Sequence, residues 1–182
     1  MKPEIRVTET YCVHEEDARN TLWAIYKDAF DRLNQRTPIH HGGFSKGQFW
    51  DVMTDPDFAK FLVYVGKDLV GVTLLTNALE KIPWINAQYF ITRYPKRYED
   101  RQIFFLPAVV IDPKHQNSRR IGAKLLQQAL TTLKRDVVLA VDYSETLRHS
   151  LPRFVQRSLG VTFSGEVLDR LVYQIFYYEE PE

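Results

Sequence analysis

Hydrophobic residues recur along this chain with two periods, one typical of strands and one typical of helices. Apolar runs that are continuous or alternate every second residue predict strands at residues 5–13, 58–65, 69–76, 104–111, 137–141, 161–166 and 168–178. Apolar residues spaced by three or four positions predict helices at residues 18–33, 48–53, 84–93, 121–133 and 144–159. The pattern therefore predicts a mixed protein of the α/β (α+β) class.

The stretch from Phe104 to Leu130 combines an apolar strand, a polar turn and an amphipathic helix. Its first part is almost wholly apolar up to Ile111, as expected of a strand that is covered on both faces. Pro107 lies inside this strand, where it removes one ladder hydrogen bond and indicates an edge or a bulge. Asp112 and Pro113 end the strand, because proline lacks the N–H that a ladder needs.

The turn between this strand and the helix has the composition of an anion site. Residues 114–120 have the sequence KHQNSRR, and Gly122 follows just inside the helix. The start of a helix carries free N–H groups and a positive dipole end, so it can hold a phosphate. Gly122 allows a ligand or strand to approach closely, at a cost of about 1 kcal/mol in helix propensity. The alternative is a plain strand-turn-helix unit with a solvated basic loop, and the residues alone leave both open.

This stretch resembles the signature segment of the GCN5-related N-acetyltransferases, which bind acetyl-coenzyme A. The family segment has a strand and a proline, a Gln/Arg-x-x-Gly-x-Gly/Ala turn, and a helix with paired leucines. Here VVIDP (109–113) matches the end of the strand, and RIGA (120–123) with Leu125 and Leu126 matches the turn and helix. Arg120 stands at the position of the first signature glycine. The Gln/Arg position lies three residues before it and falls on Asn117, whereas Gln116 stands one residue earlier. This offset indicates one inserted residue in the loop.

The resemblance covers most of the chain and implies both a fold and an activity. It implies a mixed, mostly antiparallel central sheet of about six to seven strands, flanked by helices. It also implies transfer of an acetyl or related acyl group from acetyl-CoA to an amine of a small molecule or protein. Residues 109–111 would pair with the pantetheine arm, and residues 117–123 would bind the pyrophosphate. The predicted cofactor-binding residues are Val109, Val110, Ile111, Gln116, Asn117, Ser118, Arg119, Arg120, Ile121, Gly122 and Ala123.

Proton transfer is harder to assign from the sequence than cofactor binding. Gln156 stands where the family has the tyrosine that protonates the departing thiolate, so Tyr143 is the alternative acid. A backbone N–H near Val109 or Val110 would polarise the thioester carbonyl. The strand itself has no Glu or Asp, so the base is sought in Asp142, Tyr143, two loop histidines or a water chain. Tyr143 and Asp142 are the residues predicted to be catalytic.

The two histidines, His40 and His41, lie in a loop at residues 37–47 that contains a proline and three glycines. Adjacent histidines rarely bind one ion together, and no third ligand stands at a useful spacing, so no metal site is expected. In the resembled family this region borders the acceptor pocket. A loop with histidines there would gate or orient the substrate.

Residues 77–101 form an insertion relative to the resembled family, which connects the two flanking strands more briefly. The segment carries five aromatic residues among many polar ones: Trp84, Tyr89, Phe90, Tyr94 and Tyr98. They either pack the segment onto the sheet or form one wall of the acceptor pocket, and the sequence leaves both open.

Composition narrows the class of protein and its surroundings. The chain has 182 residues, which suits a single domain over residues 1–182, and it is 45% hydrophobic and 26% charged. A formal charge of +1 argues against a general nucleic-acid binder. Cys12 is the one cysteine, which excludes an intrachain disulfide. The first residues do not form a signal peptide, and no apolar run reaches the roughly 18 residues of a membrane helix.

These observations predict a cytoplasmic acyltransferase whose partners are an acyl-CoA and an amine acceptor, without nucleic acid or membrane. A homodimer is left open. The alternative is a non-catalytic acyl-CoA-binding or protein-interaction module on the same fold. The missing tyrosine at Gln156 and the irregular turn favour that alternative.

Overall fold

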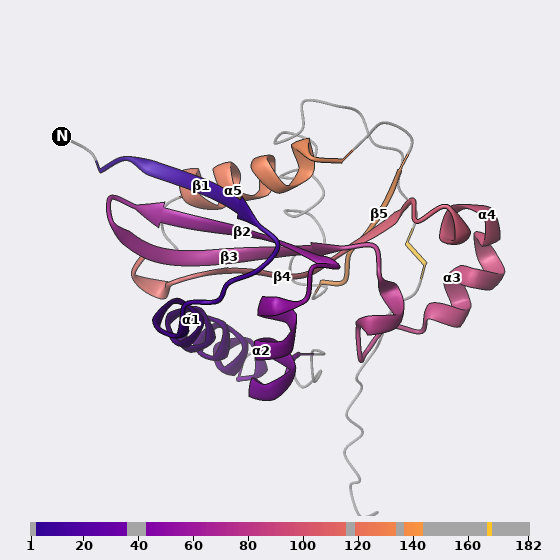
Figure 1. Cartoon of the computed structure of the whole chain (residues 1–182), viewed down its shortest axis with the longest axis horizontal. Helices are drawn as coiled ribbons and strands as arrows, with labels where there is room; N and C mark the ends of the chain where they lie inside the picture. Colours follow the sequence, from indigo (N-terminus) through magenta and orange to yellow (C-terminus); the bar gives the residue numbers. More distant parts are fainter. Residues whose placement is uncertain (1–2, 36–42, 116–118, 134–136, 144–166, 169–182) are drawn as a thin grey trace, which may run out of the picture.

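A computed structural model of the chain describes residues 3–35, 43–115, 119–133, 137–143 and 167–168 (Figure 1). The described residues form one five-stranded sheet in the order β1-β2-β3-β4-β5. Its strands are β1 (Ile5–Thr10), β2 (Phe58–Val65), β3 (Asp68–Thr76), β4 (Ile103–Ile111) and β5 (Val138–Ala140). The helices are α1 (Glu16–Asn34), α2 (Lys46–Thr54), α3 (Ala87–Arg93), α4 (Pro95–Glu99) and α5 (Arg119–Thr131), with short 3-10 turns η1 (Leu79–Lys81) and η2 (Pro113–His115).

The predicted fold class is confirmed. β1 to β4 pair antiparallel with their neighbours and β5 pairs parallel with β4, so the sheet is mixed and mostly antiparallel. The described part of the chain has five strands, fewer than the six to seven expected. The further elements predicted for residues 144–178 lie outside the described residues, apart from Val167 and Leu168.

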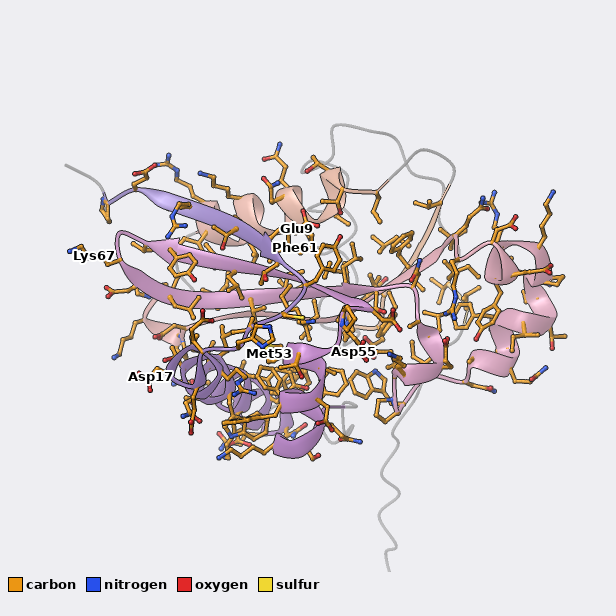
Figure 2. All side chains as sticks on the ribbon, in the orientation of Figure 1. Glu9, Asp17, Met53, Asp55, Phe61 and Lys67 are labelled. Atoms are coloured by element: carbon orange, nitrogen blue, oxygen red, sulfur yellow. The ribbon has the colours of Figure 1, made fainter. Side chains whose placement is uncertain are left out.

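Helices cover both faces of the sheet. In Figure 1, α1 and α2 lie on one face and α5 lies on the other. Successive side chains of a strand point to opposite faces, so the sheet contributes to two cores. The core on the α1 face includes Met53 of α2, and the core on the α5 face includes Phe61 of β2 (Figure 2). Both residues are fully buried.

Local sequence signals explain where the two helices of the α1 face begin. α1 buries Leu22, Ile25 and Tyr26 at helical spacing and has acidic residues in its first turn, where the helix dipole favours them. α2 begins after Ser45, two residues before the start predicted from the sequence, residue 48. The Ser45 hydroxyl accepts a hydrogen bond from the Gln48 N–H, and the Gln48 side chain accepts one from the Ser45 N–H. This reciprocal cap stabilises a helix by about 1 kcal/mol.

The segment between β3 and β4 contains η1, α3 and α4. The sequence predicted a helix at 84–93 broken by Pro95, whereas α3 begins at Ala87 and Pro95 starts α4 at its first position. Four of its five aromatic residues pack against the core of the α1 face, and Tyr89 is exposed: the packed ones are Trp84, Phe90, Tyr94 and Tyr98. The packing therefore favours the interpretation that they attach the segment to the sheet.

Both ends of this segment are tied together. The Asn77 amide donates to the Arg101 carbonyl at 3.0 Å, and the Arg101 guanidinium donates to the Asn77 carbonyl at 3.2 Å. The same guanidinium forms an ion pair with Glu80 at 2.8 Å. Arg101 has a φ of 54°, a conformation that costs a non-glycine residue about 1–2 kcal/mol. The reciprocal bonds hold it there.

Lys60 of β2 is fully buried and joins three segments of the α1 face. Its ammonium group donates to the carbonyl oxygens of Tyr11, after β1, and of Asp55, after α2. Burial lowers the pKa of Lys60 to about 8, because the charged form loses its hydration, and the nearby acidic groups offset this only in part.

Lys60 is predicted to make the fold more stable as the pH rises above 8. Its pKa is near 8 in the folded chain and about 10.4 in the unfolded chain. Between these values the unfolded chain binds the additional proton, so the free energy of unfolding increases with pH. Urea denaturation of the wild type and of Lys60→Met, from about pH 7.5 to about pH 10, measures this effect. The free energy of unfolding of the wild type should increase relative to that of Lys60→Met as the pH rises. Lys67→Met, in the exposed hairpin turn, is the control. A difference that stays constant over this range contradicts the prediction.

Candidate functional site

β4 pairs with β5 over only part of its length. The parallel pairs are Ile103 with Val138, Phe104 with Leu139, and Phe105 with Ala140. β4 then continues to Ile111 beside β3, while no described residue of β5 pairs with it. We refer to residues 107–111 of β4, on the side that faces away from β3, as the parted edge.

A β-bulge accompanies the parting of the strands. Leu74 of β3 pairs with Ala108, but Thr76 pairs with Phe105, so Leu106 and Pro107 together occupy the place opposite one β3 residue. The prediction that Pro107 marks an edge or a bulge is confirmed. The extra residue also changes which side chains face each core. The α1-face core contains residues 103 and 105 before the bulge and residues 108 and 110 after it.

The hydrogen bonds of β4 determine which backbone groups point toward the parted edge. The Asp112 N–H donates to the Val70 carbonyl at 2.8 Å. Directly opposed residues of an antiparallel pair alternate between bonded and non-bonded pairs, so Val110 also bonds to β3. The N–H and C=O of Val109 and Ile111 then point toward the parted edge. The sequence left open whether the Val109 or the Val110 N–H would polarise the thioester carbonyl. The Val109 N–H faces this edge, and the Val110 N–H faces β3.

Val109 has the most exposed side chain of β4. It is 46% exposed, while its neighbours Ala108 and Val110 are 5% and 4% exposed. Across the sheet it pairs with Thr73, which is fully buried and whose hydroxyl has no hydrogen-bond partner among the described residues. The Thr73 hydroxyl is therefore a buried polar group without a hydrogen-bond partner among the described residues, next to the one exposed side chain of β4.

The start of α5 lies beside the end of β4. A Cβ added to Gly122 would meet only the Ile111 side chain, at the ordinary contact distance of 3.5 Å. Packing against the described residues therefore does not require glycine at this position. Ile121 is buried, Arg120 is exposed and Ala123 is half-buried. Residues 116–118, which include the predicted Gln116, Asn117 and Ser118, lie outside the described residues, and of Arg119 only the backbone is described.

Asp142 and Tyr143 follow directly after β5. Val138 and Ala140 pack on the α1 face, and Leu139 and Val141 pack on the α5 face. The same alternation directs Asp142, next to Val141, toward the α1 face, but β5 ends at Ala140 and the alternation does not extend to Tyr143. The position of Asp142 agrees with its electrostatic effect on α1. Burial raises the pKa of Tyr26 to about 12, and the charge of Asp142 adds to this rise.

Asp142 and Tyr143 are adjacent in the chain directly after β5, and Asp142 is exposed whereas Tyr143 is half-buried. Their roles as base and acid stay predictions. His40, His41 and Gln156 lie outside the described residues. Within the described ranges, no group of three or more His, Cys, Asp or Glu residues is arranged to hold a metal ion, and no helix is long and apolar enough to cross a membrane.

Sequence reasoning missed two polar groups near this site. Tyr26 was assigned only to the core of α1, and Thr73 was not distinguished from the other residues of its strand. Both had a signal in the sequence, because a buried tyrosine tip or a threonine inside an apolar strand needs a hydrogen-bond partner. The sequence does not show what lies beside either group.

Solved structures share this fold, although no family model and no curated protein matches the sequence. One is an aminoglycoside acetyltransferase, meta-AAC0020 from an uncultured soil metagenomic sample, in complex with sisomicin. It is 11% identical to this chain with a TM-score of 0.54, and the match covers 94% of this chain and 96% of that protein. A GCN5-related N-acetyltransferase from Ralstonia eutropha JMP134 is 12% identical with a TM-score of 0.54, covering 92% and 99%. A transcriptional regulator from Bacillus halodurans C-125 is 14% identical with a TM-score of 0.51, covering 93% and 100%.

The chain therefore has the fold of the GCN5-related N-acetyltransferases, as the resemblance of its signature segment implied. Identities of 11–14% show the likeness of the fold alone. The roles of individual residues have to be argued from this chain.

The same substitution is predicted to have opposite effects at two glycines of this site. A Cβ on Gly71 of β3 would lie 2.5 Å from the Val110 carbonyl oxygen, so Gly71→Ala should destabilise the fold by about 1–3 kcal/mol. Gly122→Ala meets no such contact and should stabilise α5 by up to about 1 kcal/mol. Denaturant titration of both variants measures the two changes in unfolding free energy. A loss of stability in Gly122→Ala equal to that in Gly71→Ala would contradict the described packing.

Proposed function

We propose that this protein transfers an acetyl or related acyl group from an acyl-CoA to an amine. The observation that carries the proposal is the parting of β4 from β5 next to the start of α5. This arrangement combines a strand edge that can pair with an extended ligand and a helix start that favours an anion. The proposal takes residues 1–182 as one acyl-CoA-binding domain, with residues 77–101 as an inserted segment.

The residues of the parted edge fit the donor. The Val109 C=O would accept a hydrogen bond from an amide N–H of the pantetheine arm, as in a neighbouring strand, which leaves the Val109 N–H for the thioester; residues 110–111 would follow the arm along the strand. The exposed Val109 side chain would lie against the arm. Beyond it, the open position at Gly122 would admit the pyrophosphate, held by the helix start. The proposed binding residues there are Gln116, Asn117, Ser118, Arg119, Arg120, Ile121, Gly122 and Ala123.

The bound acyl-CoA would supply an activated thioester, and the residues of the chain would supply position and proton transfer. The Val109 N–H would donate to the thioester carbonyl oxygen as negative charge develops there. Asp142, on the α1 face, would take the proton that the attacking amine loses. Tyr143 would give a proton to the departing sulfur. Correct positioning alone contributes about 7–11 kcal/mol to such a reaction.

The position of both residues directly after β5 supports these roles, because the two strands part at this end of β5. In this scheme the donor lies on the α5 face and the amine arrives from the α1 face, so two distinct proton transfers are needed.

A second candidate function is a non-catalytic acyl-CoA-binding or protein-interaction module. One observation favours it: a structure with this fold is described as a transcriptional regulator rather than as a transferase. Titration calorimetry with acetyl-CoA, followed by thiol release with phenethylamine, spermidine, kanamycin and a lysine-containing peptide, separates the two functions. Binding with thiol release supports the transferase. Binding without release on all four amines supports the module, and no binding contradicts both.

The position of the proposed pyrophosphate site is tested by Gly122→Asp. A carboxylate at the start of α5 would repel the pyrophosphate, so the affinity for acetyl-CoA should fall by at least about tenfold. Gly122→Ala is the matched control, because it adds a Cβ without charge, and Gly122→Asn separates charge from size. Calorimetry measures all three, with circular dichroism as the check on folding. A folded Gly122→Asp variant with wild-type affinity would refute this placement.

A further inference from the structure

Thr73 of β3 is fully buried, and its hydroxyl has no hydrogen-bond partner among the described residues. The described part of the chain has two other buried polar residues, and both have partners. Lys60 donates to two backbone carbonyl groups, while the Thr76 hydroxyl donates to the Asp57 carbonyl at 2.7 Å and accepts from the Ala78 N–H at 3.0 Å. A buried hydroxyl without a partner destabilises a fold, so the hydroxyl of Thr73 requires a separate explanation.

The packing around Thr73 accounts for its shape but not for its hydroxyl. Val72 and Leu74, on either side of it in β3, point into the core of the α1 face, so Thr73 points to the α5 face. On that face it lies between its pairing partners, the buried Phe61 of β2 and Val109 of β4 (Figure 2). Both partners are apolar. A valine at this position would have nearly the same shape and would leave no polar group unpaired.

Thr73 lies directly across from the most exposed side chain of the parted edge. Val110 bonds to β3, so Val109 and Thr73 form a non-bonded pair, in which the two Cα atoms lie only about 4.5 Å apart. Their side chains point to the same face, where Val109 is 46% exposed and Thr73 is covered. A donor that pairs with residue 109 and lies over the Val109 side chain would therefore come next to the Thr73 hydroxyl.

We propose that the Thr73 hydroxyl donates a hydrogen bond to the sulfur of the bound acyl-CoA. The hydroxyl is covered in the free protein, and the exposed Val109 side chain turns aside as the donor binds. The thioester lies at the Val109 N–H, and Thr73 is the β3 residue paired with Val109, so the reacting end of the donor is the part that the hydroxyl meets. This inference rests on the proposed acyl transfer and adds a group that acts on its leaving sulfur.

The hydrogen bond strengthens as the acyl group leaves the sulfur. The amine nitrogen bonds to the acyl carbon, the bond from this carbon to sulfur breaks, and its electron pair stays on the sulfur. A thiolate is a stronger hydrogen-bond acceptor than a thioester sulfur, so Thr73 stabilises the transition state more than the bound donor. Thr73 keeps its own proton. The proton of the amine goes to Asp142 and the thiolate receives one from Tyr143, as in the proposed transfer.

The same substitution at the two buried threonines of β3 tests whether the Thr73 hydroxyl is unpaired in the free protein. Thr73→Val removes a group without a partner, so the melting temperature should stay unchanged or rise. Thr76→Val removes a hydroxyl with two hydrogen bonds and should lower the melting temperature by at least about 2–4 °C. Thermal denaturation followed by circular dichroism measures both. An equal loss in the two variants would show that Thr73 has a partner inside the fold, and would overturn the inference.

The catalytic test uses whichever of the four amines the wild type acetylates fastest. Thr73→Val should lower the rate of acetyl transfer in a single turnover about tenfold or more, with the acetyl-CoA affinity unchanged within about twofold. Thr73→Ser keeps the hydroxyl and should retain the rate within about threefold. Thr76→Val, which pairs with Phe105 rather than with the parted edge, should transfer at the wild-type rate. An equal loss of rate in Thr76→Val would show that the packing of β3 controls the rate, and would refute the inference.

A second comparison covers the case in which Thr73→Val does not fold. Thr73→Ser and Thr73→Ala both lack the methyl group and differ in the hydroxyl alone, so the serine variant should transfer about tenfold faster or more. Equal rates in these two variants would overturn the inference. Wild-type protein that binds acetyl-CoA but acetylates none of the four amines refutes both this inference and the proposed transfer. Turnover by the wild type that Thr73→Val leaves unchanged refutes this inference alone.

Discussion

The limited pairing between β4 and β5 determines how the rest of this site is arranged. The two strands pair as far as Phe105 and Ala140, and the bulge at Pro107 then shifts β4 by one residue. Proline has no N–H to donate to a ladder, so few hydrogen bonds are lost when the strands part at this residue. The shift turns the backbone groups of Val109 and Ile111 toward the parted edge. On the other side, Gly71 allows β4 to lie close to β3, because a Cβ at this position would lie 2.5 Å from the Val110 carbonyl oxygen.

A sheet with helices on both faces gives two separate approaches to this edge. The α5 face offers the exposed Val109 and the start of α5 beside Ile111. The α1 face offers Asp142 and the hydroxyl of Tyr26. In the proposed reaction the donor and the acceptor use different faces and meet at the edge. The proposed acid and base would then act in two separate proton transfers.

Features that depend on neighbouring residues were predictable from the sequence. The helix at residues 18–33 and the bulge at Pro107 follow from hydrophobic spacing and the chemistry of proline. Features that depend on the pairing of distant segments were not. The direction of the Val109 N–H requires the β3 register, and the hydrogen bond from the Phe44 N–H to the Tyr26 hydroxyl joins α1 to the residues just before α2. The aromatic residues of the 77–101 segment have a pattern that suits either core or pocket, and only tertiary packing distinguishes the two.

The central claim is that an acyl-CoA pairs with the parted edge of β4, and backbone amide chemical shifts test it most directly. Acetyl-CoA should shift the amide signals of Val109 and Ile111 and of the first turn of α5. The amides of Ile103 to Phe105, which face β5 or the interior of the sheet, should change much less. Shifts confined to other surfaces, such as the exposed start of α2, would contradict the account, as would the absence of any shift at saturating ligand.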